Sequence, residues 1–202
     1  MTLVEMIEAV QRKLGVDVDG RPGTETWGAI YAALVKPKID GVAPADAVST
    51  VDERSEKTIA TLLPEVQPLA RALVQKAAVN GITIKIISGH RSYAEQDALY
   101  AQGRTAPGKK VTNARGGYSN HNFGIAFDVG VFSGRQYLGE SPKYKAVGVL
   151  GMELGLEWGG KWTSFADEPH FQLRPTWARA MTERDMLAAL RQKVADGLPI
   201  FA

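Results

Sequence analysis

Two of the chain's three histidines stand near acidic residues, and these side chains have the types and spacing to do chemistry. His121 is followed seven residues later by Asp128, and His170 closes the segment DEPH, which also contains Asp167 and Glu168. Two imidazoles and one carboxylate form the ligand set of a catalytic zinc site, in which a fourth position stays open for water. Zinc lowers the pKa of such a water to about 7, which makes hydroxide available at neutral pH.

Hydrolysis at such a site also needs a carboxylate outside the ligand set, which takes the proton of the water and delivers it to the leaving amine. Asp167 stands three residues before His170 and is placed for this role, with Glu168 as the neighbouring alternative. A single histidine is more often structural than a ligand, so His121 alone does not decide the question. Asp128 favours the metal, because a carboxylate among apolar neighbours needs a partner or a cation.

Hydrophobic patterns show the strands and helices that could position these residues. The segment ITIKIIS alternates and predicts a strand leading into GHRS, whereas GIAFDVGVF predicts a buried strand that carries Asp128. Ser92 and Glu95 form a capping-box pattern, which predicts that a helix follows them. Residues 103–124 have no periodicity and are predicted to form one long loop, which in a compact domain is usually functional.

Further elements are predicted on both sides of this region. One helix is expected to begin near Asp52, and another is expected to end at the NG of residues 80–81. Two more are expected over about 141–154 and about 175–194. LEW and HFQL have the character of short strands. Because strands and helices mix irregularly and no internal repeat is visible, the pattern indicates the α+β class.

The first 36 residues form a separate pattern that predicts a small helical unit. A helix closed by Gly15 precedes the turn VDVDG, and a second helix opens at Thr24 or Thr26 and runs through Trp27. VDVDG lacks the ligand spacing of a calcium loop. Residues 37–51, with two prolines and no periodicity, are predicted to be a linker to a catalytic domain over residues 52–202.

Composition limits the classes of function. The chain has 202 residues, 45% hydrophobic and 23% charged, which is typical of a globular protein. A net charge of +2 is too small to indicate nucleic acid as a partner, and the absence of cysteine excludes disulfides and thiolate ligands. Neither a secretory signal nor a membrane helix is visible, so we expect a soluble protein made in the cytoplasm, without membrane insertion.

The motifs around the histidines are specific when taken together. SNHNFGIAFD matches S-x-H-x-x-G-x-A-x-D, and DEPH supplies the following acidic-x-x-H. Over residues 52–180 the chain resembles the zinc peptidases of the D-Ala-D-Ala carboxypeptidase and L-alanyl-D-glutamate endopeptidase superfamily, particularly the phage endolysin branch. The resemblance implies a small antiparallel sheet under one zinc ion per chain. It also implies that His121, Asp128 and His170 are the zinc ligands and that Asp167 is the general base.

The same resemblance implies a role for Arg91 and for the loop that follows it. Arg91 closes an SG-x-R motif and would clamp the scissile carbonyl or a substrate carboxylate with its fixed fork of donors. The alternative is that it only pairs with a nearby acid. His90, where relatives commonly have an aromatic or small residue, is expected to be exposed. The likeness extends through the substrate loop, and the residues expected to contact substrate there are Gln96, Arg115, Tyr118 and Ser119.

Two further features have both a functional and a structural interpretation. Four basic residues and no acidic one lie between positions 98 and 127, namely Arg104, Lys109, Lys110 and Arg115. They could form a basic lip that attracts the carboxylates of peptidoglycan stem peptides, or a solvated loop with incidental charge. Of the two tryptophans in LEWGGKW, we expect one in the core and one in the groove wall, and we assign Trp158 to the wall.

The function implied by the resemblance is zinc-dependent hydrolysis of peptidoglycan stem peptides, in particular of the L-Ala-D-Glu bond, by a monomeric lysin that acts on the wall after release. A D-Ala-D-Ala carboxypeptidase would share every catalytic residue and remains the alternative. A wall-binding protein without activity is disfavoured, because it need not keep Asp167. VQRKLGVDVDGRPGTETWGAI at the N-terminus resembles one half of a type 1 peptidoglycan-binding module.

Overall fold

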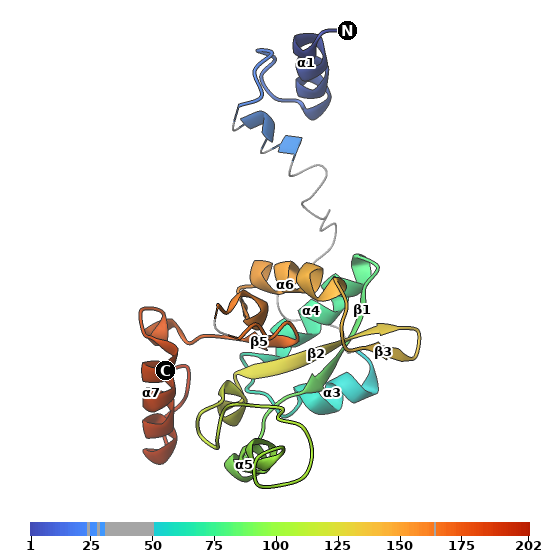
Figure 1. Ribbon diagram of the computed structural model, residues 1–202. Coiled ribbons are helices and arrows are strands. Elements are labelled where there is room, and N and C mark those ends of the chain that lie inside the picture. Colours follow the sequence, from blue (N-terminus) through green and yellow to red (C-terminus); the bar gives the residue numbers. More distant parts are fainter. Residues whose placement is uncertain (24, 28, 31–50, 164) are drawn as a thin grey trace. The chain divides into compact units, whose positions relative to one another are not determined.

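The computed structural model describes residues 1–23, 25–27, 29–30, 51–163 and 165–202. The chain divides into two compact units, Met1–Ala47 and Val48–Ala202, which are treated separately below (Figure 1). Almost all of the predicted linker, residues 37–51, lies outside the described residues, as do Thr24 and the later part of the predicted second helix. The domain boundaries at residues 36 and 52 therefore stay a prediction.

The first unit is built around a buried glutamine. Helix α1 (Leu3–Leu14) begins at a capping box formed by Thr2 and Glu5 and ends at Gly15, which has a φ of 71°. Residues 25–27 and 29–30 are also helical. The Gln11 side chain is 1% exposed and contacts the turn, since it donates to Asp19 and accepts from the amide of Gly20.

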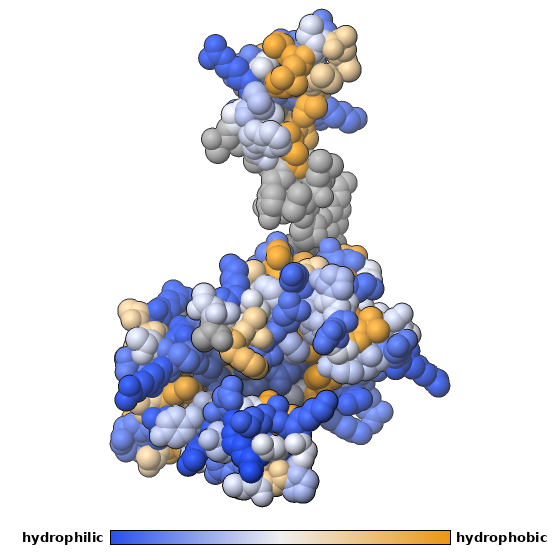
Figure 2. Space-filling model, in the orientation of Figure 1, coloured by the Kyte–Doolittle hydropathy of each residue, from blue (hydrophilic) through white to orange (hydrophobic). Residues whose placement is uncertain are grey.

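The described apolar residues of this unit lie mostly at its surface. Figure 2 shows hydrophobic side chains gathered over α1. The exposed set within the described part of the unit comprises Met1, Leu3, Val4, Met6, Val10, Val18 and Trp27. The apolar face predicted for the first helix is therefore largely open to solvent in the part of the chain that the structure describes.

The second unit contains one antiparallel sheet with helices packed against it, which confirms the α+β class. The strands have the order β1-β2-β5-β4, and β3 pairs with β2 at one end. Helices α3 and α4 pack on β1, and α6 packs on α4 and β4 (Figure 1). The strands are β1 (Thr83–Ser88), β2 (Ala126–Ser133), β3 (Gln136–Leu138), β4 (Glu157–Trp158) and β5 (His170–Gln172). The helices are α3 (Glu53–Ile59), α4 (Gln67–Val79), α5 (Tyr93–Ala101), α6 (Lys143–Glu153) and α7 (Glu183–Ala195).

Two glycines let α6 approach the short strands closely. A Cβ added to Gly148 would lie 2.3 Å from Cδ2 of Trp158, and one added to Gly151 would lie 2.4 Å from Cε1 of Phe171. Such distances are far inside van der Waals contact, so only glycine fits at these positions. The helix thereby covers Trp158 and Phe171 and adds them to the core of the sheet.

The structure differs from the predicted elements in three places. The predicted loop 103–124 contains a short 3₁₀ helix, η2 (Asn120–Phe123), and Asn122 Oδ1 accepts from the amides of Gly117 and Ser119 at its N-terminus. The last helix begins at Glu183 and not near residue 175, because Thr182 caps it there and only a 3₁₀ turn (Thr176–Ala178) precedes it. Strand β3 was not predicted.

Among the described helices, none has the length and apolar character that crossing a membrane requires.

Candidate metal centre and active site

Three adjacent elements bring the predicted zinc ligands together. Asp128 on β2 and His170 on β5 are directly opposite partners in the antiparallel register. His121 lies on η2, and the chain turns from η2 into β2 at Gly124, which has a φ of 67°. This left-handed conformation costs glycine little and other residues considerably more, so Gly124 lets His121 and Asp128 converge.

The facing atoms of these three side chains have the spacing of a tetrahedral zinc site. His121 Nε2 and His170 Nδ1 each lie 3.2 Å from Asp128 Oδ1, and the two nitrogens lie 3.3 Å apart. Zinc with bonds of about 2.0–2.1 Å and tetrahedral angles holds its ligand atoms about 3.3 Å apart. The residues therefore fit the metal, and a cation there would also satisfy lone pairs that point at one another.

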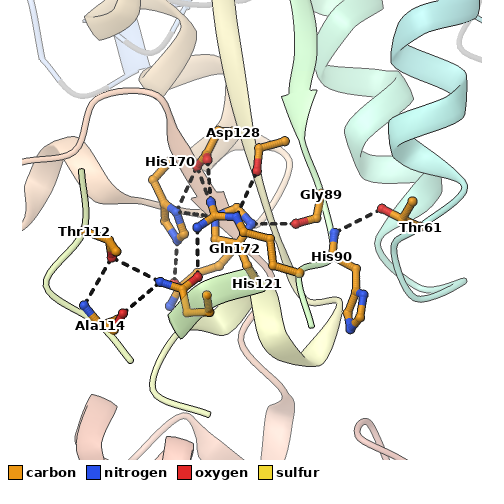
Figure 3. Close-up of polar contacts among 12 residues, drawn as sticks. Thr61, Gly89, His90, Thr112, Ala114, His121, Asp128, His170 and Gln172 are labelled. Atoms are coloured by element: carbon orange, nitrogen blue, oxygen red, sulfur yellow. Dashed lines mark hydrogen bonds and ion pairs between the residues drawn. The ribbon is translucent and has the colours of Figure 1, made fainter. Parts of the chain in front are cut away.

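The outer nitrogen of each imidazole is held by an acceptor. His121 Nδ1 lies 2.7 Å from the carbonyl oxygen of Gly89, and His170 Nε2 lies 3.0 Å from Oε1 of Gln172 (Figure 3). A ring nitrogen that faces an acceptor carries the proton of a neutral imidazole, so the other nitrogen keeps its lone pair. The inner nitrogens of both histidines are thus left free to bind a metal.

Arg91 reaches the outer oxygen of the central carboxylate. Its Nη2 donates to Asp128 Oδ2 at 2.9 Å, Nη1 donates to Gln96 Oε1 at 3.0 Å, and Nε donates to Ser88 Oγ at 3.2 Å. The pairing with an acid, which the sequence left as the alternative for Arg91, is present in the structure. It leaves Asp128 Oδ1 facing the two histidines.

Electrostatics around the site follow from burial and from these contacts. Burial lowers the pKa of His121, which favours the neutral imidazole that a metal requires. Burial opposes ionisation of Asp128, but the two histidines outweigh it and hold the pKa of that carboxyl well below its usual range. Burial, together with the charge of Asp128, raises the pKa of Asp167, as suits a carboxylate that must accept a proton.

A pocket of about 940 Å³ opens over these residues. His121, Asp128 and His170 line it together with Asp167, whereas Glu168 is not among the described lining residues. The geometry therefore favours Asp167 as the candidate base. Tyr118 and Ser119 also line the pocket, as expected for substrate contacts, and their part in binding stays a prediction.

Two other residues expected to contact substrate do not line the pocket. Gln96 is fully buried, and its amide donates to Thr112 Oγ1 and to the carbonyl of Ala114, so it supports the loop from inside. The guanidinium of Arg115 lies 4.9 Å from the ring centre of Tyr100. Gln96 thus faces the loop and Arg115 faces a ring on α5, and a contact of either side chain with substrate stays a prediction.

The two tryptophans have exchanged their predicted places. Trp158 packs under α6 and donates from its indole nitrogen to the carbonyl of Glu168 at 2.7 Å, so the assignment to the groove wall was wrong. Trp162 lines the pocket, is 37% exposed and has its ring centre 4.9 Å from that of His170. One tryptophan in the core and one in the wall is thus the arrangement found, with Trp162 in the wall.

The positive charge at the pocket does not come from the basic loop. None of its four basic residues is among the described residues that line the pocket, and Arg104 donates back to the carbonyls of Tyr100 and Thr112. The cations that line the pocket are Arg91, Lys161 and Arg174. The solvated-loop interpretation therefore fits the structure better than a basic lip. His90 is exposed, as predicted.

The sequence analysis also missed side chains that contact the predicted ligands from the protein interior. Among them, Gln172 contacts His170 directly. Residues two apart on a strand face the same side of the sheet. Gln172 follows His170 by two positions on β5, so this spacing could have identified it. Asn120, which precedes His121 on η2, and Glu183 on α7 gave no comparable signal, because they join the site only through tertiary contacts.

Comparison with known proteins agrees with this geometry. The M15 peptidase family model described as D-alanyl-D-alanine carboxypeptidase matches residues 112–173. The peptidoglycan L-alanyl-D-glutamate endopeptidase CwlK of Bacillus subtilis (strain 168) is 42% identical over 126 residues, which cover 56% of this chain and 74% of that protein. The chain belongs to the M15 family of peptidases. It is a zinc metallopeptidase, which confirms the resemblance seen in its motifs.

Similar solved structures include two peptidases. The L-Ala D-Glu endopeptidase ChiX of Serratia marcescens is 26% identical, with a TM-score of 0.47, over 61% of this chain and 89% of that one. The vancomycin-resistance D,D-pentapeptidase VanY in complex with Zn(II) is 15% identical, with a TM-score of 0.45, over 69% of this chain and 81% of that one.

Proposed function

We propose that this enzyme cleaves the bond between L-alanine and D-glutamate in peptidoglycan stem peptides. The observation that carries the proposal is the close triangle of His121, Asp128 and His170 at a pocket that also contains Asp167. The specific bond is suggested by the name of CwlK, to which this chain is 42% identical. The enzyme acts on the cell wall, where this substrate lies, and works as a monomer in the manner of a lysin.

Each side chain has a separate task in this proposal. His121, Asp128 and His170 hold one zinc ion, which when bound supplies a Lewis acid and lowers the pKa of water. Arg91 holds Oδ2 of Asp128, so that Oδ1 stays directed at the metal position. Asp167 accepts the proton of the attacking water and passes it to the leaving amine. Trp162 forms a wall of the pocket beside His170.

The second candidate is a D-Ala-D-Ala carboxypeptidase, because the family model that matches residues 112–173 carries that description. It would use the same ligands and the same base. The two activities differ in the bond that is cut and therefore in their products.

Product analysis separates these functions. We expect the purified protein with zinc to release peptides that begin with D-glutamate from purified peptidoglycan, as measured by mass spectrometry of the soluble digest. Loss of single D-alanine residues from the stem would instead establish the carboxypeptidase. A zinc-loaded protein that binds the wall and releases nothing would support the third possibility, a binding protein.

We also propose that the N-terminal unit increases contact with the wall, since its sequence resembles half of a binding module. The second unit has its own sheet, core and ligand set, so a chain starting near residue 45 should fold by itself. We expect this truncated protein to cleave a small soluble stem peptide at nearly the full rate. On intact sacculi it should be slower by about tenfold, because a second tethered contact raises the local enzyme concentration.

Salt provides the control for this comparison. Attraction by surface charge fades as ionic strength rises, whereas the effect of losing a binding unit should persist. Equal rates of the full and truncated proteins on both substrates would show that the unit does not target the enzyme.

A further inference from the structure

Behind His170, five side chains form a closed ring of hydrogen bonds. Gln172 donates to Glu157 Oε2 at 2.7 Å, and Arg174 donates to the other oxygen, Oε1, at 2.5 Å. Arg174 also donates to Glu183 Oε2 at 2.6 Å. Asn120 closes the ring, because its Nδ2 donates both to Glu183 Oε1 and, at 2.6 Å, to Gln172 Oε1.

The ring determines which way the Gln172 amide faces. The side-chain nitrogen of Gln172 points at the carboxylate of Glu157, which in its ionised form only accepts hydrogen bonds. The side-chain oxygen must therefore lie on the opposite side, where it accepts from Asn120 and lies 3.0 Å from His170 Nε2. If the amide were reversed, its nitrogen would face the donors of Asn120 and His170, and its oxygen would face the carboxylate of Glu157.

This orientation determines the tautomer of His170. In the neutral imidazole that a metal requires, Nε2 of His170 faces an oxygen that can only accept, so Nε2 carries the proton and Nδ1 carries the lone pair. Nδ1 is the atom that faces His121 and Asp128. His170 and Gln172 are 5% and 1% exposed, so water cannot readily take over the role of the glutamine oxygen.

We propose that Gln172 is a positioning residue for the metal site and that the ring, which extends to helix α7, holds Gln172 in place. The inference rests on the proposed ligand role of His170. Figure 3 shows Gln172 beside His170, His121 and Asp128. Through Glu183, the C-terminal helix supports the metal centre, although α7 supplies no ligand. Asn120 precedes His121 on η2, so the ring is also connected to the element that carries His121.

The substitution Gln172→Leu in the full-length protein tests the inference. It removes the acceptor for His170 and leaves the buried Nε2–H without a partner. We expect the zinc dissociation constant, measured by competition with a chelator, to rise about 10–100-fold, which is the usual cost of losing a group that orients a metal ligand. The absorption spectrum of the Co(II)-loaded protein should shift as well, because the geometry of the ligands changes.

Tyr144→Phe is the matched control. The Tyr144 hydroxyl makes two hydrogen bonds, with the amide of Val131 and the carbonyl of Leu138, at a distance from the ligands along the same sheet. Its removal should lower the stability without changing zinc affinity or the Co(II) spectrum. A shift of both quantities in Tyr144→Phe as large as in Gln172→Leu would show that general destabilisation, and not positioning, is the cause, and would overturn the inference.

An exchange of the two polar groups tests the role of the acceptor directly. Gln172→Glu alone sets a carboxylate against Glu157 and should weaken zinc binding. When it is combined with Glu157→Gln, the carboxylate at position 172 accepts from His170. The amide at position 157 then donates to that carboxylate and accepts from Arg174. We therefore expect the double variant to recover zinc affinity to within a few-fold of the wild-type protein, whereas no recovery would count against the proposal.

Other variants keep the test decisive if Gln172→Leu does not fold. Glu183→Ala opens the ring at a side chain that is 43% exposed, so folding is expected and a smaller loss of zinc affinity should result. Wild-type zinc affinity in Gln172→Leu, or in Glu183→Ala where the former does not fold, would overturn the inference. His170→Ala separates the two proposals: if it keeps wild-type zinc affinity, the proposed metal site itself is wrong.

Discussion

Replacing His121 with alanine is expected to remove both the bound zinc and the peptidase activity. The substitution takes away one of three protein ligands in a site where three are needed to hold a catalytic zinc ion. His121 is also 2% exposed, so its removal leaves a buried gap in the ligand set. Metal content per chain, measured by atomic spectroscopy after dialysis, and release of stem-peptide fragments are the two measurements.

His90→Ala is the matched control for this variant. It is the same substitution at an exposed histidine whose backbone amide, and not its ring, contacts Thr61. It should keep one zinc ion per chain and full activity. A thermal shift provides a further measure, because a ligand at 100 times its dissociation constant stabilises the folded state by about 2.7 kcal/mol. Full zinc occupancy in His121→Ala would show that the ligand assignment is wrong.

Asp167→Asn is expected to separate metal binding from chemistry. The amide cannot accept the proton of the attacking water, so turnover should fall by about 10²–10⁴-fold, the usual contribution of general acid–base catalysis. Asp167 is not one of the three converging ligands, so zinc content should not change. Steady-state kinetics on a soluble stem peptide, together with the metal content of the same sample, provide the test.

Glu168→Gln makes the same chemical change one residue later. The structure places Asp167 among the residues lining the pocket, whereas Glu168 contributes its backbone carbonyl to the indole of Trp158. The glutamine variant should therefore keep most of its activity. If Glu168→Gln were inactive and Asp167→Asn active, Glu168 and not Asp167 would be the general base.

Local patterns in the sequence were sufficient to predict the strands and the helix that carry or adjoin the site. Alternation predicted β1, a buried apolar run predicted β2, and the capping pair of Ser92 and Glu95 predicted α5. These features depend on residues close together in the chain, so they can be read without knowledge of the fold. The motif around His121 and Asp128 has the same local character, because Gly124 turns the chain between them.

Tertiary structure alone decided which side chains reach the pocket. Trp158 and Trp162 are four positions apart and equally apolar, but Gly148 of α6 leaves room for the ring of Trp158 beneath that helix. Tertiary contacts also decided which basic residues line the pocket. Arg174, for example, comes from the segment after β5 and not from the basic loop. The direction of a side chain depends on contacts between segments far apart in sequence, and local periodicity contains no information about those contacts.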